Sequence, residues 1–345
     1  MQVGEQVRLV AVVVTFGDRR ELLLPVLQAL LEQDASHIVL VDHGAVWPVA
    51  EELGPRFGSQ LTVLRLSAEQ STAAAYAAGI QAACARGDQE WLFLVDDDNV
   101  PQPNCLARLR QAYQNLLPAA SHASLAVLAY RPEHLSDIGY SEALGRVTFR
   151  PGSFRGFHLA DLPGKLWRRR PWARGHTSST LAPYTDVPYA PFSGLLFHRK
   201  LIAAHGLPRE DFVYYMDDTE FTYRITRAGG RIVLVGAATL DASKPLGHAL
   251  EVAAGASDLS DALRHESRAR LYYGTRNDVY FHTHCAGSSR LLFHLNLYTY
   301  LAILGGYALL SGRIDRFRLM REAVRDGLAG RLGKHPQVSR QDQPS

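Results

Sequence analysis

VRLVAVVVTF, residues 7–16, is an almost unbroken apolar run in which β-branched side chains predominate. Such a run is typical of a strand that is buried on both faces inside a parallel sheet. Helix and strand patterns alternate after it: a leucine-rich helical pattern (21–33), HIVLVDHG (37–44), LTVLRL (61–66), an alanine-rich helical stretch (72–85) and WLFLV (91–95). This alternation predicts an α/β fold with a doubly wound, mostly parallel open sheet. Ligands of such sheets bind beyond the carboxyl ends of the strands, so we expect the site there.

The composition excludes several classes of protein. The chain of 345 residues is 47% hydrophobic and 21% charged, which is ordinary for a globular protein with a large core. Its 37 basic and 34 acidic residues give a net charge of +3, too little for a general polyanion binder, so no nucleic-acid partner is expected. Three scattered cysteines form neither a disulfide framework nor a zinc quartet. With no signal-peptide pattern at the N-terminus, these features predict a cytoplasmic protein.

Three consecutive carboxylates follow one of the apolar runs, in WLFLVDDDNVP (91–101). Residues alternate along an extended backbone, so Asp96 and Asp98 are expected on the same side of it. Two hard oxygen ligands of this kind can hold Mg²⁺ or Mn²⁺ against a diphosphate. The alternative is a solvated acidic turn.

A second acidic group opens a helical pattern, MDDTEFTYRITRAGG (216–230). Its apolar residues are spaced as on one face of a helix, and the two final glycines are typical of a helix end. Asp217 and Glu220 have the spacing of an N-terminal capping pair, and acids in the first turn suit the helix dipole. Asp218 is left without a structural task.

Several motifs, in order, resemble family 2 of the glycosyltransferases, the inverting enzymes with a GT-A fold. They are VVVTFGDR (12–19), VDHGA (41–45), AAAYAAGI (73–80), LVDDDNVP (94–101), FSGLLF (192–197), YYMDDTEFTYR (214–224), His248 and YYGTRNDVYF (272–281). The resemblance covers roughly residues 8–285, with a looser echo in RDGLAGRLG (325–333), and is closest in style to bacterial rhamnosyl- and galactofuranosyltransferases. It implies a GT-A type nucleotide-diphospho-sugar transferase fold: a mostly parallel open sheet with flanking helices, plus C-terminal helices.

The resemblance also implies roles for individual residues. The predicted nucleotide-sugar contacts are Thr15, Phe16, Asp42, Asp96, Asp97 and Arg276. The predicted ligands of Mn²⁺ or Mg²⁺ are Asp96, Asp98 and His248, and the predicted catalytic base is Asp218, with Asp217 as its main competitor. From the residues alone, His248 could equally be a surface loop histidine, and Arg276 could form a salt bridge on a helix surface.

The predicted reaction is a metal-dependent inverting transfer of a hexose or deoxyhexose, of rhamnose or galactofuranose type. The donor would be a UDP- or dTDP-linked sugar, and the acceptor a hydroxyl of a cell-surface glycan or a lipid-linked glycan. A sugar-1-phosphate nucleotidyltransferase is the nearest rival, but it usually has a glycine-rich N-terminal phosphate loop. An oxidoreductase is disfavoured because no G-x-G-x-x-G follows the first strand. The non-enzymatic rival is a glycan-binding protein on the same fold, against which the intact acids argue.

Three parts are expected along the chain. Residues 8–285 form the catalytic domain, with a basic and aromatic excursion at about 131–190. Residues 286–334 form a C-terminal helical segment, and 335–345 a disordered tail.

The C-terminal segment contains an apolar stretch (291–310) that is long enough to span a bilayer but is interrupted by polar residues and glycines. Flanking arginines can meet anionic headgroups: Arg290, Arg313, Arg316, Arg318 and Arg321. We therefore predict that the enzyme is held at the inner face of the cell membrane by an interfacial pair of helices, without a true span. The alternative is that the stretch packs on protein, either the catalytic domain or a second subunit.

Overall fold

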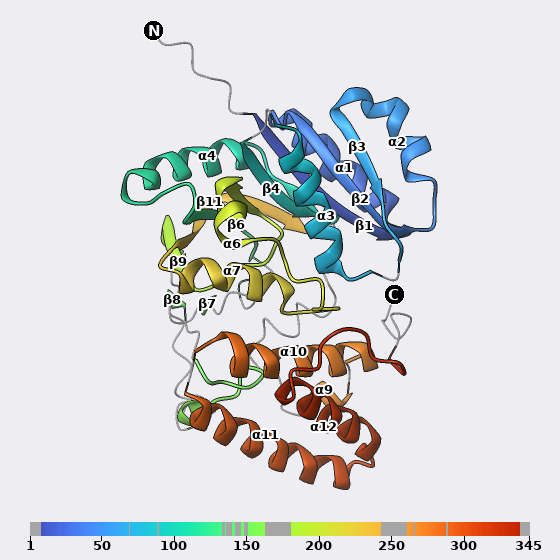
Figure 1. Cartoon of the computed structure of the whole chain (residues 1–345), viewed down its shortest axis with the longest axis vertical. Helices are drawn as coiled ribbons and strands as arrows, with labels where there is room; N and C mark the ends of the chain where they lie inside the picture. Colours follow the sequence, from blue (N-terminus) through green and yellow to red (C-terminus); the bar gives the residue numbers. More distant parts are fainter. Residues whose placement is uncertain are drawn as a thin grey trace, which may run out of the picture. The chain divides into compact units, whose positions relative to one another are not determined.

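The computed structural model describes residues 8–68, 70–87, 90–132, 135, 140–141, 146–147, 151–162, 181–242, 261–264, 266–287 and 289–338. The chain divides into two compact units. The first comprises Met1–Tyr140, Leu181–Glu210 and Asp218–Leu250, and the second comprises Ser141–Thr180, Asp211–Asp217 and Glu251–Ser345. Each unit is described by itself below (Figure 1).

The first unit is built on one large sheet with the strand order β3-β2-β1-β4-β10-β6-β11-β5, in which β9 also pairs with β11. Its strands are β1 (Leu9–Gly17), β2 (His37–Ala45), β3 (Leu61–Arg65), β4 (Trp91–Asp96), β5 (Asn99–Pro101), β6 (Leu125–Tyr130), β9 (Tyr184–Val187), β10 (Leu195–His198) and β11 (Arg231–Ala242). The strands β3, β2, β1 and β4 are parallel, and β6 is parallel to β11. Strand β10 runs antiparallel to both its neighbours, β4 and β6. The predicted α/β class with its open sheet is confirmed.

Helices cover both faces of this sheet, which explains why the strands are apolar on both sides. The helices of the first unit are α1 (Arg20–Glu32), α2 (Val49–Phe57), α3 (Thr72–Ala85), α4 (Cys105–Leu116), α6 (Lys200–His205) and α7 (Asp217–Arg227), the last of which begins in the second unit. The alternate residues Leu9, Ala11 and Val13 of β1 share a core with the apolar faces of α1, α2 and α4. The opposite face of β1 lies against α3, where a Cβ on Gly79 would come within 2.5 Å of Val12. The alanine-rich composition of α3 therefore permits a close approach of helix to sheet.

The second unit is mainly helical. A continuous helical stretch runs through η6 (Arg270–Gly274), α10 (Thr275–Tyr280) and η7 (Phe281–Cys285), and its first and last segments are π-helical. It packs against α12 (Ile314–Leu328), which in turn packs against α11 (Arg290–Leu310). The short helix α9 (Asp261–Arg264) adds to the same core. The predicted C-terminal helices are thus present, in orange to red in Figure 1.

The structure adds detail to two of the predicted segments. Phe154 and Phe157, which belong to the basic and aromatic excursion, are buried in the core of the second unit. The beginning of the predicted tail is also packed, because Val338 is buried and its carbonyl accepts a hydrogen bond from Tyr273. Residues 339–345 lie outside the described part of the chain.

Candidate functional site

The carboxyl ends of β1, β2 and β4 form one edge of the sheet. These strands are parallel neighbours, with Thr15 opposite Asp42 and Val14 opposite Asp96. The predicted residues of three separate motifs are thereby brought together: Thr15, Phe16, Asp42, Asp96, Asp97 and Asp98.

The three consecutive acids differ in exposure. The side chains of Asp96 and Asp98 are 42% and 25% exposed, whereas that of Asp97 is 2% exposed. Strand β4 ends at Asp96, and Asp97 and Asp98 form the turn between β4 and β5, so the turn, and not the extended backbone that we predicted, produces this alternation. Two carboxylates therefore face solvent, and one points into the protein.

Asp97 connects the turn that carries Asp96, Asp97 and Asp98, called the acid turn below, to the end of β1. It accepts a hydrogen bond of 2.7 Å from the hydroxyl of Thr15 and lies 3.2 Å from Nε of Arg19. Burial raises the pKa of Asp97 to about 7, although the Arg19 charge and the Thr15 hydrogen bond act in the opposite direction. Its geometry favours a role in shaping the turn over the predicted direct contact with the nucleotide sugar.

Asp96 is held at the edge of the site by residues of other elements. Its Oδ1 accepts a hydrogen bond of 2.5 Å from the Tyr76 hydroxyl of α3, and its backbone N–H donates to Ser193 Oγ. Arg131 lies 3.9 Å from its other oxygen. Loss of hydration at the crowded strand end, and then the neighbouring charge of Asp98, raise the pKa of Asp96 despite Arg131.

Asp98 forms an ion pair with Arg19, whose guanidinium also lies over the ring of Phe16 at 4.7 Å. Its second oxygen accepts a hydrogen bond from Asn99. Arg19 was not among the predicted site residues, although it closes the motif VVVTFGDR. Tyr76 was also missed, and the only signal for it was one aromatic residue within a run of alanines.

The strand-end acids suit a divalent cation. Asp96 and Asp98 offer hard oxygen ligands that are partly exposed to solvent, and such ligands suit Mg²⁺ or Mn²⁺. Arg19 provides the positive charge beside Asp98, so a cation bound there would replace it as counter-charge. The third predicted ligand, His248, lies outside the described residues.

Asp42 lies near the carboxyl end of the neighbouring strand β2. Its Oδ1 accepts a hydrogen bond from the backbone N–H of Ala45, and Arg65 lies 3.9 Å from its other oxygen. Gly44 adopts a φ of 85°, and a Cβ there would meet Ala68 at 2.4 Å. The end of β2, with Asp42 in it, is thus fixed by local contacts.

Helix α7 is linked to the acids through an aromatic stack within the first unit. The ring of Tyr76, which contacts Asp96, lies 4.4 Å from that of Phe192, and Phe192 lies 5.9 Å from Phe221 of α7. One aromatic layer therefore separates the acid turn from this helix. Glu220, buried in its first turn, is neutralised by Arg224, which also donates to the carbonyls of His205 and Leu207.

The two acids at the start of α7 differ in burial. Asp217 is buried, whereas Asp218 is half-buried and its Oδ1 accepts hydrogen bonds from the N–H and hydroxyl of Thr219. Asp218 is therefore the more accessible of the two acids.

Arg276 is buried in the second unit. Its guanidinium donates to the carbonyl of Gly333 and to Asn277 Oδ1, and it lies over the rings of Tyr272 and Tyr273. These contacts favour a structural task over the predicted contact with a diphosphate. Asn277, to which the sequence assigned no role, donates to the carbonyls of Tyr214 and Tyr215, just before α7.

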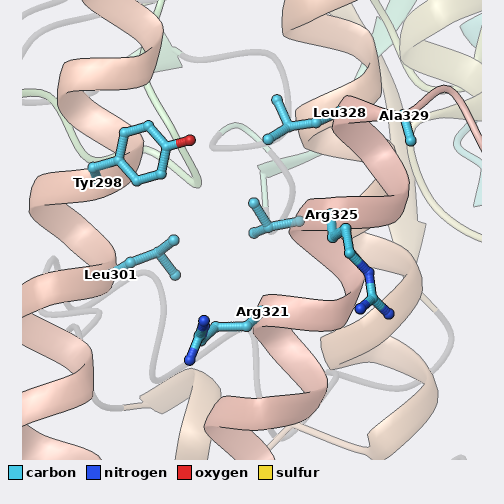
Figure 2. A pocket seen from close by; sticks show the side chains of 7 residues that line it. Tyr298, Leu301, Arg321, Arg325, Leu328 and Ala329 are labelled. Carbon is cyan, nitrogen blue, oxygen red and sulfur yellow. The ribbon is translucent and has the colours of Figure 1, made fainter.

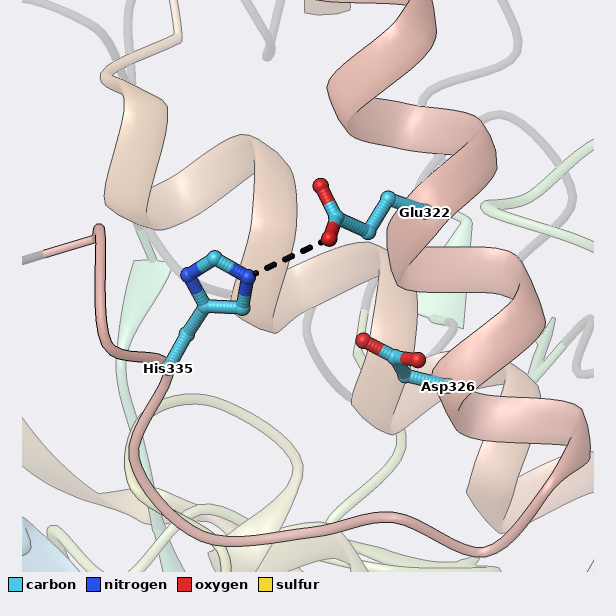
Figure 3. A group of neighbouring side chains, drawn as sticks. All are labelled: Glu322, Asp326 and His335. Carbon is cyan, nitrogen blue, oxygen red and sulfur yellow. Dashed lines mark hydrogen bonds and ion pairs between the residues drawn. The ribbon is translucent and has the colours of Figure 1, made fainter.

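Glu322, Asp326 and His335 form a further cluster with metal-ligand chemistry in the second unit (Figure 3), and their ligand atoms lie within 4.8 Å of one another. Asp326 already accepts hydrogen bonds from Tyr272 and Arg331. His335 Nδ1 accepts the backbone N–H of Gln337, so the proton of the neutral ring is on Nε2, which faces Glu322 at 3.5 Å. The cluster is therefore satisfied as a hydrogen-bonded group.

The chain matches a family model described as "Glycosyltransferase like family 2" over residues 7–269. No curated protein sequence matches it. Among solved structures it is similar to S. aureus TarS 1–349 in complex with UDP-GlcNAc, with 14% identity and a TM-score of 0.52 over 93% of this chain and 80% of that one. It is also similar to the mannosyltransferase PcManGT from Pyrobaculum calidifontis in complex with GDP-Man and Mn²⁺, with 14% identity and a TM-score of 0.50 over 95% and 76%. The chain spans about half the length of another similar structure, GalNAc-T7 with UDP, GalNAc and Mn²⁺ (14% identity, TM-score 0.47, coverage 76% and 51%).

Proposed function

The chain belongs to the family described as "Glycosyltransferase like family 2", and from that premise we propose that it is a metal-dependent, inverting hexosyltransferase that uses a nucleotide diphosphate sugar. The observation that carries this proposal is the alternate exposure of the acid turn. Asp96 and Asp98 face solvent together while Asp97 anchors the turn. A turn that served only the fold would have no need of two solvent-exposed like charges so close together in the chain.

The proposed donor site lies at the ends of β1, β2 and β4. Asp96, Asp98 and His248 would hold Mn²⁺ or Mg²⁺, and the ion would stabilise the charge of the departing diphosphate. Thr15, Phe16 and Asp42 would contact the nucleoside, with the partly exposed ring of Phe16 as an apolar surface. The complexes of TarS with UDP-GlcNAc and PcManGT with GDP-Man and Mn²⁺ support the class of donor and the use of a divalent metal.

Asp218 is the proposed general base. In an inverting displacement the acceptor hydroxyl attacks the anomeric carbon as the bond to the diphosphate breaks, and the hydroxyl proton passes to the base. Asp218 then carries the proton, and the nucleoside diphosphate leaves with the electron pair of the broken bond. Holding the acceptor and the donor in line supplies the remainder of the rate enhancement.

The proposed donor is UDP- or dTDP-linked, with a rhamnose- or galactofuranose-type sugar, and the proposed acceptor is a cell-surface glycan or lipid-linked glycan. This choice rests on the motif resemblance. A lipid-linked acceptor would also agree with the surface of α11 and α12.

We place the enzyme at the inner face of the cell membrane as a peripheral protein. In the described part of the chain, α11 is the one helix long and apolar enough to span a membrane, and a third of its most apolar window is buried. Large apolar side chains on this helix are 45% to 92% exposed: Leu291, Leu295, Tyr298, Ile303, Leu309 and Leu310. The exposed arginines Arg318, Arg321 and Arg325 line α12 beside it.

The two helices border a groove of about 480 Å³ (Figure 2). Tyr298 and Leu301 of α11 face Arg321 and Leu328 of α12 across it. An apolar floor with a cationic rim suits an acyl chain below an anionic headgroup. Two of the arginines that we expected at the headgroups turn inward instead: Arg313 donates to the carbonyl of Leu263, and Arg316 to those of Ala262 and Glu266.

Turnover assays test the proposed function. Wild-type protein is incubated with a panel of UDP-, dTDP- and GDP-sugars, with and without Mn²⁺, and the release of nucleoside diphosphate is measured. We expect release from at least one donor that depends on the metal. Pyrophosphate release from a nucleoside triphosphate and a sugar 1-phosphate would instead identify a nucleotidyltransferase. Binding of nucleotide sugar without turnover, with glycan acceptors present, would identify a non-catalytic binding protein.

A further inference from the structure

The backbone that leads into α7 is strained. Tyr215 and Met216 are consecutive non-glycine residues with φ values of 60° and 66°, in the left-handed region that side chains rarely adopt. The next two residues are Asp217 and Asp218. Strain of this kind persists only where the surroundings hold it, and it concentrates at functional sites.

The fully buried amide of Asn277 holds this turn. Its Nδ2 donates to the carbonyls of Tyr214 and Tyr215, the latter at 2.9 Å, so both amide hydrogens are used on adjacent peptide units. Its Oδ1 accepts a hydrogen bond of 2.9 Å from Nε of Arg276. Because Arg276 can only donate, this bond determines which end of the amide faces the turn.

The C-terminal motif RDGLAGRLG (325–333) contacts Arg276 and holds its guanidinium in place. Arg276 donates to the carbonyl of Gly333, and the N–H of Gly333 donates to the carbonyl of Asp211 at 2.9 Å. A Cβ on Gly327 would lie 2.5 Å from the carbonyl oxygen of Arg276, so only glycine permits this approach. Segment 211–217 is thus anchored near both ends by contacts within the second unit.

We propose that Asn277, oriented by Arg276, is a positioning residue for the proposed general base. It stabilises the left-handed turn at Tyr215 and Met216. This turn determines where α7 begins and therefore the position and direction of the Asp218 carboxylate. The inference rests on the proposed function of Asp218. It also gives a task to two motifs, R-N at 276–277 and RDGLAGRLG at 325–333, which donor binding alone leaves unexplained.

Asn277→Ala tests the proposal, with Asn296→Ala as its matched control. Asn296 is also fully buried in the second unit, and its amide also bonds to backbone, from Leu159 and to Gly152. Both variants should lose stability, but only Asn277→Ala removes contacts to segment 211–217. Asn277→Ser keeps one donor and provides the measurement if the alanine variant does not fold.

The first readout, hydrogen exchange of residues 214–222, requires no substrate. We expect at least about tenfold faster exchange there in Asn277→Ala, because the turn opens locally, and no change there in Asn296→Ala. The second readout is the split between kcat and KM for the best nucleotide sugar of the panel. We expect kcat to fall by about 10- to 100-fold in Asn277→Ala, with little change in donor KM or in Mn²⁺-dependent UDP binding, since small displacements of a reacting group are costly.

Two results would overturn the inference. One is unchanged exchange at 214–222 in Asn277→Ala; the other is a kcat of Asn277→Ala that falls no further than that of Asn296→Ala, which includes full activity of Asn277→Ala. Asp218→Asn separates this failure from that of the proposed function. Full activity of Asp218→Asn removes the proposed base itself, whereas inactive Asp218→Asn beside fully active Asn277→Ala contradicts only the positioning role.

Discussion

At the scale of single residues, Asp97 makes stability depend on pH. Burial raises its pKa from 3.8 to about 7, so between about pH 4 and pH 7 the native state binds more protons than the unfolded chain. The free energy of unfolding therefore falls as the pH rises through this window, by up to about 1.4 kcal/mol for each unit of pKa shift. Asp96 contributes with the same sign, because its pKa is also raised.

Asp97→Asn should remove most of this dependence while it keeps an acceptor for Thr15. We expect the variant to have a higher Tm than the wild type at about pH 8 and a similar Tm at about pH 4.5. Thermal unfolding at the two pH values measures the difference. Parallel pH profiles for the two proteins would contradict the raised pKa.

Arg19 should compete with metal for Asp98. Arg19→Gln removes the cation that pairs with this carboxylate, so Mn²⁺ binding without nucleotide should tighten several-fold, in keeping with about 1 kcal/mol for a partly exposed pair. Titration of Mn²⁺, followed by electron paramagnetic resonance, measures the change. Arg20→Gln is the control, since the neighbouring Arg20 pairs with Glu52. Equal or weaker binding in Arg19→Gln would exclude this competition.

At the scale of elements, substitutions of the two acids at the start of α7 should have different effects, one on catalysis and one on stability. Asp218→Asn should lower kcat by several orders of magnitude with little change in donor affinity, because the acceptor proton loses its base. Asp217→Ala should mainly cost about 1 kcal/mol of stability, as expected for an acid in the first turn of a helix. Steady-state kinetics and thermal unfolding of both variants distinguish the roles. A catalytic loss at Asp217, with only a stability loss at Asp218, would reverse them.

The elements also show how far the sequence predicts the fold. The apolar runs of β1, β2 and β4 predict a parallel sheet because only strands buried on both faces need them. The antiparallel direction of β10 could not be predicted, since a short, fully buried strand has the same composition in either direction. The sequence placed the three acids at the end of a strand, but the turn at Asp97 and Asp98, which sets their exposures, could not be predicted from strand geometry.

The side chains that contact Asp96 and Asp98 could not be predicted from the local sequence pattern. Arg19 and Tyr76 reach Asp98 and Asp96 from helix regions that are 79 and 20 residues away in the chain. Such contacts depend on how elements pack, which periodicity does not encode. The sequence also contained no signal for the strained turn at Tyr215 and Met216, because neither residue type favours a positive φ.

At the scale of the whole molecule, the exposed face of α11 should bind anionic membranes. We expect the wild-type protein to float with vesicles that contain phosphatidylglycerol at low salt and to float less at high salt, as headgroup attraction is screened. The double variant Leu295→Glu/Tyr298→Glu should stay in the soluble fraction. Val46→Glu is the control, because Val46 is also a highly exposed apolar residue but lies in the first unit.

A soluble wild-type protein at low salt would contradict the membrane assignment. Dimerisation of the wild type, abolished by the same double variant and accompanied by no flotation, would show instead that the face of α11 binds a second copy of the chain. These outcomes leave the catalytic proposal intact.

The central claim, metal-dependent use of a nucleotide sugar at the strand-end acids, is tested most directly by calorimetric titration of UDP, dTDP and GDP into the intact protein with and without Mn²⁺. We expect at least one of them to bind more tightly with Mn²⁺ to the wild type and to Asp186→Ala, which removes an exposed acid of the same unit that pairs with Arg231. Asp98→Ala should fold normally but lose the effect of Mn²⁺ on binding. If Asp98→Ala keeps the full effect of Mn²⁺, or if Mn²⁺ has no effect on the wild type, the assignment of the metal site is wrong.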